Sequence, residues 1–252
     1  MNTQEERMQQ LRTMEDYVEE QGPLLESLVL LNQSKVIVEI GVAEAKTTKY
    51  LCNGSRLHDG TVYGYDLWDT HGLNKQFEHW SSKEKCEQHL RDNDCTNYEL
   101  TQIDSTTQEF KDLIKQKHPV IDFAFIDGCH SYSGIKNDFD VLYPQLSETG
   151  VIVFHDTMSI DGCREFMIDL RTKFNDGTFD LVTFPYGSMI FSDGIKKDRR
   201  TGISVLVKRG FAVIPQPIDE QCNLEENFDD IYVKEEKWYE KELKKYSKKK
   251  IK

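Results

Sequence analysis

Four side chains of the types that serve as general bases or metal ligands follow two apolar runs of the sequence. The run Ile121–Ile126 leads into Asp-Gly-Cys-His, and the run Val151–Phe154 leads into His-Asp. If these runs are neighbouring parallel strands, the residues after them meet at the edge of the sheet where ligands bind. Two carboxylates and two imidazoles in one cleft could carry general-base or metal chemistry, although the aspartates could also simply cap helices. The four side chains are Asp127, His130, His155 and Asp156.

A glycine follows the first apolar run, Val36–Ile40. Gly41 allows a sharp turn and a close approach of the backbone to a ligand, and a helix after it would present free N–H groups to the same point. The segment is not G-x-G-x-x-G, because Ala43 and Glu44 occupy positions where further glycines would favour a pyrophosphate. An ordinary turn between a strand and a helix would have the same residues.

Acidic residues also end the second and third apolar runs. Asp66 stands 25 residues after Gly41, near the spacing at which a carboxylate binds the ribose hydroxyls of a nucleotide. Asp104 and Ser105 form a second polar pair, placed to reach an adenine edge. Each aspartate alone could be a surface residue, but their occurrence at successive strand ends favours a nucleotide-like ligand.

Short β-rich runs alternate with polar, amphipathic spans from Lys35 onward, which predicts a parallel sheet covered by helices on both faces. The last two runs have no helix between them and predict an antiparallel pair at one edge. We therefore expect a Rossmann-like, doubly wound α/β fold. The expected strands are Val36–Ile40, Val62–Tyr65, Tyr98–Ile103, Ile121–Ile126, Val151–Phe154, Phe179–Phe184 and Ile203–Val207, and the expected helices are Thr47–Cys52, Ser82–Arg91, Thr107–Lys117, Gly134–Leu146 and Gly162–Phe174.

Helical extensions flank this core. Apolar residues recur at helical spacing from Met8 to Val18, Gly22-Pro23 is expected to break the helix, and Leu24–Leu31 forms a second one. Residues 237–252 are rich in lysine and read as a solvated terminal helix. The predicted organisation is a helical extension over 1–34, one core domain over 35–210 and a C-terminal extension over 211–252.

Composition excludes several classes of protein. The net charge of −12 argues against a general nucleic-acid binder, and no apolar run approaches the roughly 18 residues that span a bilayer. The start is polar, so we expect a cytoplasmic protein with no membrane partner. The six cysteines form no C-x-x-C pair and are expected to be free thiols rather than zinc ligands.

Four stretches resemble a known family: VEIGVAEAKTT, GYDLW, FAFIDGCHSYSGIKNDF and GVIVFHDT. They are similar to class I S-adenosylmethionine-dependent methyltransferases, in the group with macrolide-sugar O-methyltransferases and cephalosporin-hydroxylase-like proteins. The similarity spans about residues 35–208. It implies that the first stretch lines the methionine part of the cofactor, that Asp66 and Leu67 hold its ribose, and that Asp104 and Ser105 hold its adenine. The resemblance further implies cofactor contacts at Glu39, Gly41, Ala43 and Thr47 in the first stretch and at Asp127 in the third.

The resemblance also implies the catalytic roles. In better-understood relatives, the residues that match Asp127 and His130 are a metal ligand and the catalytic base, and a carboxylate matching Asp156 completes the metal site. There, an acidic residue precedes that carboxylate, whereas this chain has His155. The usual second glycine of the first motif is Ala45 here. The expected mechanism places an alcohol beside His130, which takes its proton, with Mg²⁺ or another divalent cation between the two aspartates.

The methyl acceptor is expected to be a small molecule or a glycan, with a sugar hydroxyl first, while amine or carboxylate acceptors stay open. Aromatic residues and histidines after the second strand could stack on a sugar or aromatic ring, or could pack the insertion onto the domain. The segment Tyr186–Met189 could close the other side, and the N-terminal helices could form a homo-oligomer. The residues after the second strand are Trp68, His71, Phe77, His79 and Trp80.

Three other functions remain as alternatives. A nicotinamide-dependent oxidoreductase would share the sheet and Asp66, but it predicts the pyrophosphate-binding glycines that are missing. A non-catalytic scaffold or cofactor sensor would not need a base beside two carboxylates. A metal-dependent hydrolase would use the same carboxylates, yet would leave Gly41 and Asp66 without a purpose.

Overall fold

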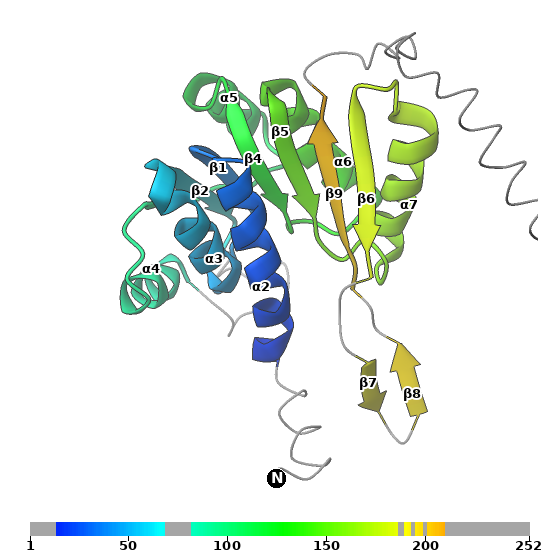
Figure 1. Cartoon of the computed structure of the whole chain (residues 1–252), viewed down its shortest axis with the longest axis horizontal. Coiled ribbons are helices and arrows are strands. Elements are labelled where there is room, and N and C mark those ends of the chain that lie inside the picture. The colour runs from blue at the N-terminus through cyan, green and yellow to red at the C-terminus, as the bar shows by residue number, and fades with distance from the viewer. Residues whose placement is uncertain (1–13, 69–81, 186–188, 193–194, 199–200, 210–252) are drawn as a thin grey trace, which may run out of the picture. The chain divides into compact units, whose positions relative to one another are not determined.

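The computed structural model describes residues 14–68, 82–185, 189–192, 195–198 and 201–209. Seven strands form one sheet in the order β3-β2-β1-β4-β5-β9-β6 (Figure 1). The first five are parallel, and β9 runs antiparallel to both β5 and β6. The predicted Rossmann-like fold with an antiparallel edge pair is therefore confirmed. The strands are β1 (Val36–Ile40), β2 (Thr61–Asp66), β3 (Tyr98–Gln102), β4 (Ile121–Ile126), β5 (Leu146–Phe154), β6 (Phe179–Phe184) and β9 (Ile203–Lys208).

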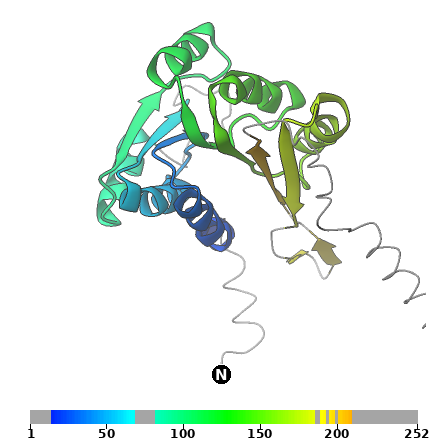
Figure 2. The ribbon, with the colours of Figure 1, turned by 45° about the horizontal axis from the view of Figure 1, so that its top comes forward.

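Helices pack on both faces of the sheet, as Figure 2 shows. The buried apolar residues form two clusters. Helices α2, α3 and α4 contribute to one cluster, and α5, α6 and α7 contribute to the other. Because the central strands are buried on both faces, their sequences are mostly apolar rather than alternating. The helices are α2 (Met14–Leu31), α3 (Lys46–Ser55), α4 (Lys83–Asp92), α5 (Gln108–Lys117), α6 (Tyr132–Leu142) and α7 (Asp161–Asp169).

The expected helix break at Gly22-Pro23 is wrong, because α2 runs through both residues. Pro23 lacks an N–H for the helix ladder, which costs about 3 kcal/mol. Leu25 and Val29 in the same helix are almost fully buried, and each burial contributes about 1.5–3 kcal/mol. Gly22 lets α2 pack closely against α3, because a Cβ at this position would lie 2.2 Å from the ring of Tyr50 in α3.

Other bounds also differ from the expected ones. The helix expected over Gly134–Leu146 begins at Tyr132 and ends at Leu142, so that β5 already begins at Leu146. The connection between β6 and β9, in which no helix was expected, contains a hairpin of β7 (Met189–Ser192) and β8 (Ile195–Asp198). The expected extension over 211–252 lies outside the described residues. Within the described part, no helix has the length and apolar character needed to cross a membrane.

The strand pairing aligns the carboxyl ends of the parallel strands along one edge of the sheet. Ile40 of β1 pairs with Ile126 of β4, which pairs in turn with Phe154 of β5. Ile40 also pairs with Tyr65 of β2. The residues that follow these strands are consequently gathered along one edge of the sheet, which is where ligands bind in open α/β folds.

Candidate active site

Backbone hydrogen bonds continue past the strand ends and fix the first loop residues. The N–H of Gly41 donates to the carbonyl of Tyr65 at 2.9 Å, and the N–H of Asp127 donates to that of Ile40 at 2.8 Å. Gly41 has a φ of +87°, and a Cβ on it would lie 2.2 Å from the carbonyl oxygen of Asp127. This position therefore requires glycine for two reasons, the left-handed backbone and the close approach of the loop after β4.

A cavity of about 250 Å³ lies at these strand ends. It brings together seven of the nine residues expected to bind the cofactor. The other two, Glu39 and Thr47, are not part of its lining. The lining consists of Ile40, Gly41, Ala43, Tyr65, Asp66, Leu67, Ile103, Asp104, Ser105, Thr106, Asp127, Gly128 and Cys129.

Asp66 organises the wall of the cavity that β1 and β2 share. One carboxylate oxygen accepts the N–H of Ala43 at 2.8 Å, and the other accepts the N–H of Trp68, also at 2.8 Å. The Trp68 indole N–H donates to the carbonyl of Ala43 at 3.2 Å, and its side chain is buried. Trp68 therefore packs against the domain. His71, Phe77, His79 and Trp80, which were expected to join it in the aromatic segment, lie outside the described residues, as do 186–188 of Tyr186–Met189.

Asp104 and Ser105 form the opposite part of the lining. The Asp104 carboxylate accepts hydrogen bonds from the backbone N–H and the hydroxyl of Thr106, at 2.8 and 2.7 Å. The carbonyl of Ser105 accepts from the side-chain amide of Asn137 in α6 at 3.0 Å. These bonds hold the loop after β3 in place at the cavity.

Glu39 lies fully buried behind the first loop. The hydroxyl of Thr48 donates to its Oε2 at 2.6 Å, whereas Oε1 has no hydrogen-bond partner. Burial raises the pKa of Glu39 to about 8, because a charged carboxylate would be poorly solvated there. Sequence reasoning selected Thr47 but missed Thr48. Thr48 lies in the first turn of α3, and its spacing from Glu39 gave no signal of this contact.

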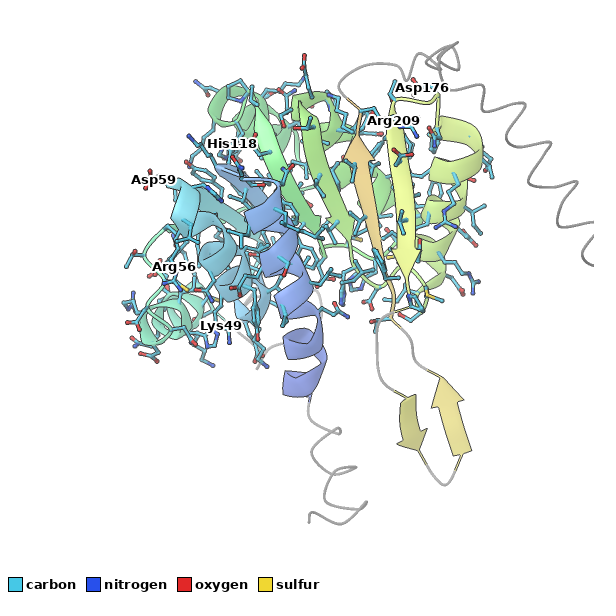
Figure 3. All side chains as sticks on the ribbon, in the orientation of Figure 1. Lys49, Arg56, Asp59, His118, Asp176 and Arg209 are labelled. Atoms are coloured by element: carbon cyan, nitrogen blue, oxygen red, sulfur yellow. The ribbon has the colours of Figure 1, made fainter. Side chains whose placement is uncertain are left out.

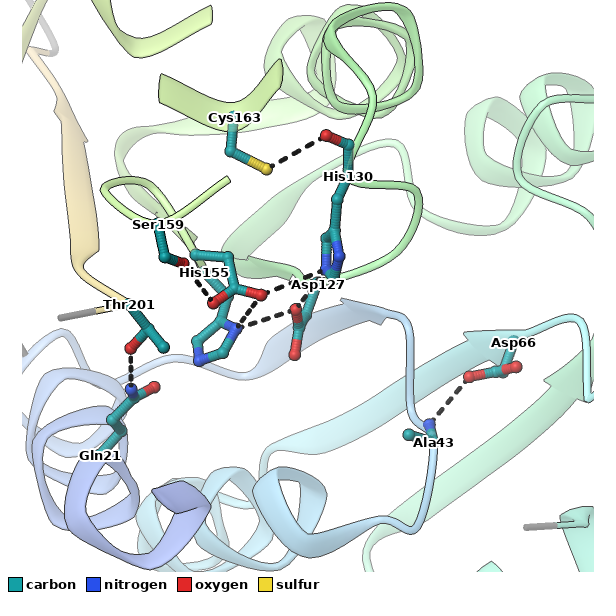
Figure 4. A network of polar contacts seen from close by, with 10 residues as sticks. Gln21, Ala43, Asp66, Asp127, His130, His155, Ser159, Cys163 and Thr201 are labelled. Carbon is teal, nitrogen blue, oxygen red and sulfur yellow. Dashed lines mark hydrogen bonds and ion pairs between the residues drawn. The ribbon is translucent and has the colours of Figure 1, made fainter. Parts of the chain in front are cut away.

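Asp127, His130, His155 and Asp156 lie close together, and Figure 4 labels the first three of them. Nε2 of His130 lies 3.1 Å from Oδ1 of Asp127, and Nδ1 of His155 lies 3.0 Å from the same oxygen. The same two nitrogens lie 3.7 and 3.5 Å from Oδ2 of Asp156. The hydroxyl of Ser159, which sequence reasoning missed, donates to the other oxygen of Asp156 at 3.3 Å. Two carboxylates thus face two imidazoles, as the adjacent strand ends predicted.

The charges of this cluster act on one another. Burial alone would raise the pKa of Asp127, but the neighbouring imidazoles outweigh it and lower that pKa to about 2. Burial would likewise lower the pKa of His155, yet the two carboxylates raise it to about 10. The hydrogen bond with Asp127 also raises the pKa of His130. Without a bound cation, the imidazolium of His155 supplies positive charge beside the two carboxylates.

The donor atoms of this cluster are close enough to share a metal ion. One atom each from Asp127, His130 and Asp156 lies within 4.8 Å of the other two. Asp156 has a left-handed φ of +54°, a conformation that aspartate tolerates better than most residues. The residues present therefore fit a divalent cation, with one departure from the pattern of the resembled family: an imidazole, His155, stands where the third acidic side chain would be.

Comparisons with known proteins agree with this geometry. Residues 38–157 match a family model described as a methyltransferase domain. No curated protein matches the chain. Among solved structures, an O-methyltransferase from Bacillus cereus in complex with S-adenosylhomocysteine is 15% identical with a TM-score of 0.56, covering 81% of this chain and 86% of that chain. TomG from Streptomyces achromogenes, an O-methyltransferase involved in tomaymycin synthesis and solved with S-adenosylmethionine, is also 15% identical with a TM-score of 0.53, covering 75% and 80%.

The structural similarity, at this low identity, concerns the fold, and the family model concerns the stretch that carries the cavity and the four charged side chains. The resemblance to the class I S-adenosylmethionine-dependent methyltransferases that the motifs predicted is thus confirmed over residues 38–157, the stretch that matches the methyltransferase domain model.

Proposed function

We propose that this chain transfers the methyl group of S-adenosylmethionine to a hydroxyl group of a small molecule or glycan, with His130 as the general base. The observation that carries the proposal is the position of Asp127. Its side chain belongs both to the lining of the cavity and to the cluster, where it is hydrogen-bonded to His130. A cofactor in the cavity would therefore have its reactive end beside an acid–base group.

The cavity residues suit this cofactor. Asp66 keeps acceptor capacity beyond the two N–H groups it binds, because a carboxylate offers about four lone-pair sites, and it can take up ribose hydroxyls. Asp104 and Ser105 would contact the adenine, while Gly41 and Ala43 bring backbone close to the methionine part. Two similar structures hold S-adenosylmethionine or S-adenosylhomocysteine, which supports the same assignment.

The base has a defined task in this reaction. The sulfonium already makes the methyl group electrophilic, so the S–CH₃ bond breaks as the O–CH₃ bond forms, and S-adenosylhomocysteine leaves. The acceptor hydroxyl loses its proton to the imidazole of His130, which Asp127 and Asp156 then stabilise as an imidazolium. Cys163 donates a weak hydrogen bond of 3.6 Å to the backbone carbonyl of His130 and helps to hold this residue in place.

A divalent cation, Mg²⁺ or another, would be held by Asp127 and Asp156 with His130 beside it. When bound, such an ion lowers the pKa of a hydroxyl and orients it. Removal of the proton still falls to His130. A sugar hydroxyl is the acceptor that we propose first, on the precedent of the resembled family.

The proposal is tested by calorimetric titration of the purified protein with S-adenosylmethionine and S-adenosylhomocysteine, with and without magnesium. We expect micromolar binding of at least one of them. A folded protein that binds neither, and that binds NAD instead, would refute the proposed cofactor.

The base is tested with His130→Ala in a methyl-transfer assay against sugar hydroxyl acceptors. We expect a loss of about a hundredfold or more in turnover with cofactor binding unchanged. His89→Ala is the matched control, because His89 lies in α4 and does not line the cavity. Near-normal turnover of His130→Ala would show that another group takes the proton.

A further inference from the structure

The immediate neighbour of Asp156 sets the chemistry of the charged cluster. His155 directs its Nδ1 at the same carboxylate oxygens as His130 does, with 3.0 Å to Oδ1 of Asp127 and 3.5 Å to Oδ2 of Asp156. Only 16% of its side chain is exposed. The cluster therefore presents two imidazoles and two carboxylates, and its formal anionic charge comes from the two aspartates.

Outer contacts hold two of these donors in place. The hydroxyl of Ser159 binds Oδ1 of Asp156, which leaves Oδ2 facing the imidazoles. The backbone N–H of His155 donates to the carbonyl of Ile126 at 3.1 Å, so that its position is fixed to the end of β4. Such contacts orient ligands and typically change metal affinity by about 10–100-fold when they are lost.

This donor set selects among metals. Mg²⁺ prefers oxygen ligands in an octahedral arrangement. Imidazole nitrogen suits zinc, iron, nickel and copper, and Mg²⁺ competes poorly with these metals for a nitrogen ligand. An acidic side chain at position 155 would give three carboxylates and favour the harder ion. An imidazole there replaces one charged oxygen donor with a neutral nitrogen donor when it coordinates.

We infer that His155 makes this cluster a site for a divalent transition-metal ion such as Zn²⁺ or Co²⁺ rather than for Mg²⁺. The inference rests on the proposed function only in taking the cluster as a metal centre, and it specifies which ion that centre selects. Asp127, His155 and Asp156 are the ligands, and His130 stays beside them as the proposed base.

The experiment uses Co²⁺ as the probe, because its visible absorption reports coordination without any activity measurement. The full-length, tag-free protein is titrated with Co²⁺ and separately with Mg²⁺, and Zn²⁺ is then added to displace Co²⁺. We expect one Co²⁺ per chain, displaced by Zn²⁺, with an affinity at least tenfold above that for Mg²⁺. Equal or tighter binding of Mg²⁺, or no Co²⁺ binding by the folded protein, would overturn the inference.

Two substitutions at the same position make the test specific. His155→Glu should weaken Co²⁺ binding and strengthen Mg²⁺ binding, each by at least about tenfold, whereas His155→Gln should weaken Co²⁺ binding without any gain for Mg²⁺. Asp161→Asn is the control, since Asp161 is exposed and pairs with Arg164 rather than with the cluster. An unchanged metal preference in a folded His155→Glu protein would also overturn the inference.

Binding of S-adenosylhomocysteine is measured in parallel on the same samples. Its binding without any Co²⁺ binding would refute this inference and leave the proposed function standing. Co²⁺ binding without S-adenosylhomocysteine binding would support the metal assignment and refute the proposed cofactor.

Discussion

The carboxylate of Asp66 accepts a hydrogen bond of 2.8 Å from the backbone N–H of Ala43. This bond joins the end of β2 to the loop after β1, although the two residues are 23 positions apart in the sequence. Ala43 adopts a left-handed φ of +48°, and Ala45 follows with +60°. Asp66 thus stabilises an unfavourable loop conformation while its side chain lines the proposed cofactor cavity.

Replacing Asp66 should weaken both functions of this side chain. For Asp66→Ala we expect S-adenosylhomocysteine binding to fall about 10–100-fold, because charge-assisted hydrogen bonds contribute about 1.5–3 kcal/mol. Calorimetry measures the affinity. Asp122→Ala is the matched control: Asp122 also accepts two backbone N–H groups, those of Lys35 and Val36, but it does not line the cavity. An equal loss of affinity in both variants would show that general destabilisation explains the effect.

Gly41→Ala should disturb the site more than an ordinary glycine replacement. The variant combines a positive φ with a Cβ that would overlap the backbone of Asp127, so we expect a loss of stability of about 3 kcal/mol or more. Gly177→Ala separates the two effects, since Gly177 has a φ of +90° and an open space around its Cβ position. Chemical denaturation measures both variants. If both substitutions lower the free energy of unfolding by the same amount, the close approach to Asp127 does not contribute to the loss.

Much of the fold could be predicted because a doubly buried strand has an unambiguous sequence. The run Ile121–Ile126 coincides with β4, and the edge pair follows from two apolar runs without a helix between them. Gly22-Pro23 misled the prediction because helix propensity is local, whereas the packing of α2 on α3 involves residues distant in sequence. The hairpin β7–β8 left no alternating apolar pattern to detect.

The sequence predicted which residues meet at the strand ends, but not how their side chains are oriented. Adjacent strands had to place Asp127 near Asp156, because parallel strands end at the same edge. The orientation of His155 toward Asp127 depends on the loop after β5, where Asp156 takes a left-handed conformation. Such backbone angles follow from tertiary contacts, so residue type and spacing alone do not determine them.

Glu39 should make the protein less stable as the pH rises through neutrality. Its pKa is about 8 in the folded protein and near 4.5 when exposed, so between these values the folded state holds a proton that the unfolded state releases. The free energy of unfolding therefore falls from pH 4.5 to pH 8, by at most about 5 kcal/mol. Glu39→Gln removes this dependence. Denaturation of both proteins between pH 5 and 9 checks it, and parallel curves would contradict the assignment.

His118 should make the protein less stable as the pH falls below about 6.5. This buried residue, labelled in Figure 3, has its Nε2 2.6 Å from the hydroxyl of Tyr65, and burial lowers its pKa to about 4. As the pH drops, the unfolded chain takes up a proton on His118 near pH 6.5, whereas the folded protein takes it up only near pH 4. The free energy of unfolding therefore falls as the pH drops from 6.5 to 4. The expected loss is on the order of 3 kcal/mol. His118→Gln cannot titrate and should flatten this part of the profile, after an initial loss of about 1–3 kcal/mol for the altered contact with Tyr65. Denaturation midpoints between pH 4 and 7 measure the difference, and an equally steep profile in the variant would assign the acid sensitivity to other groups.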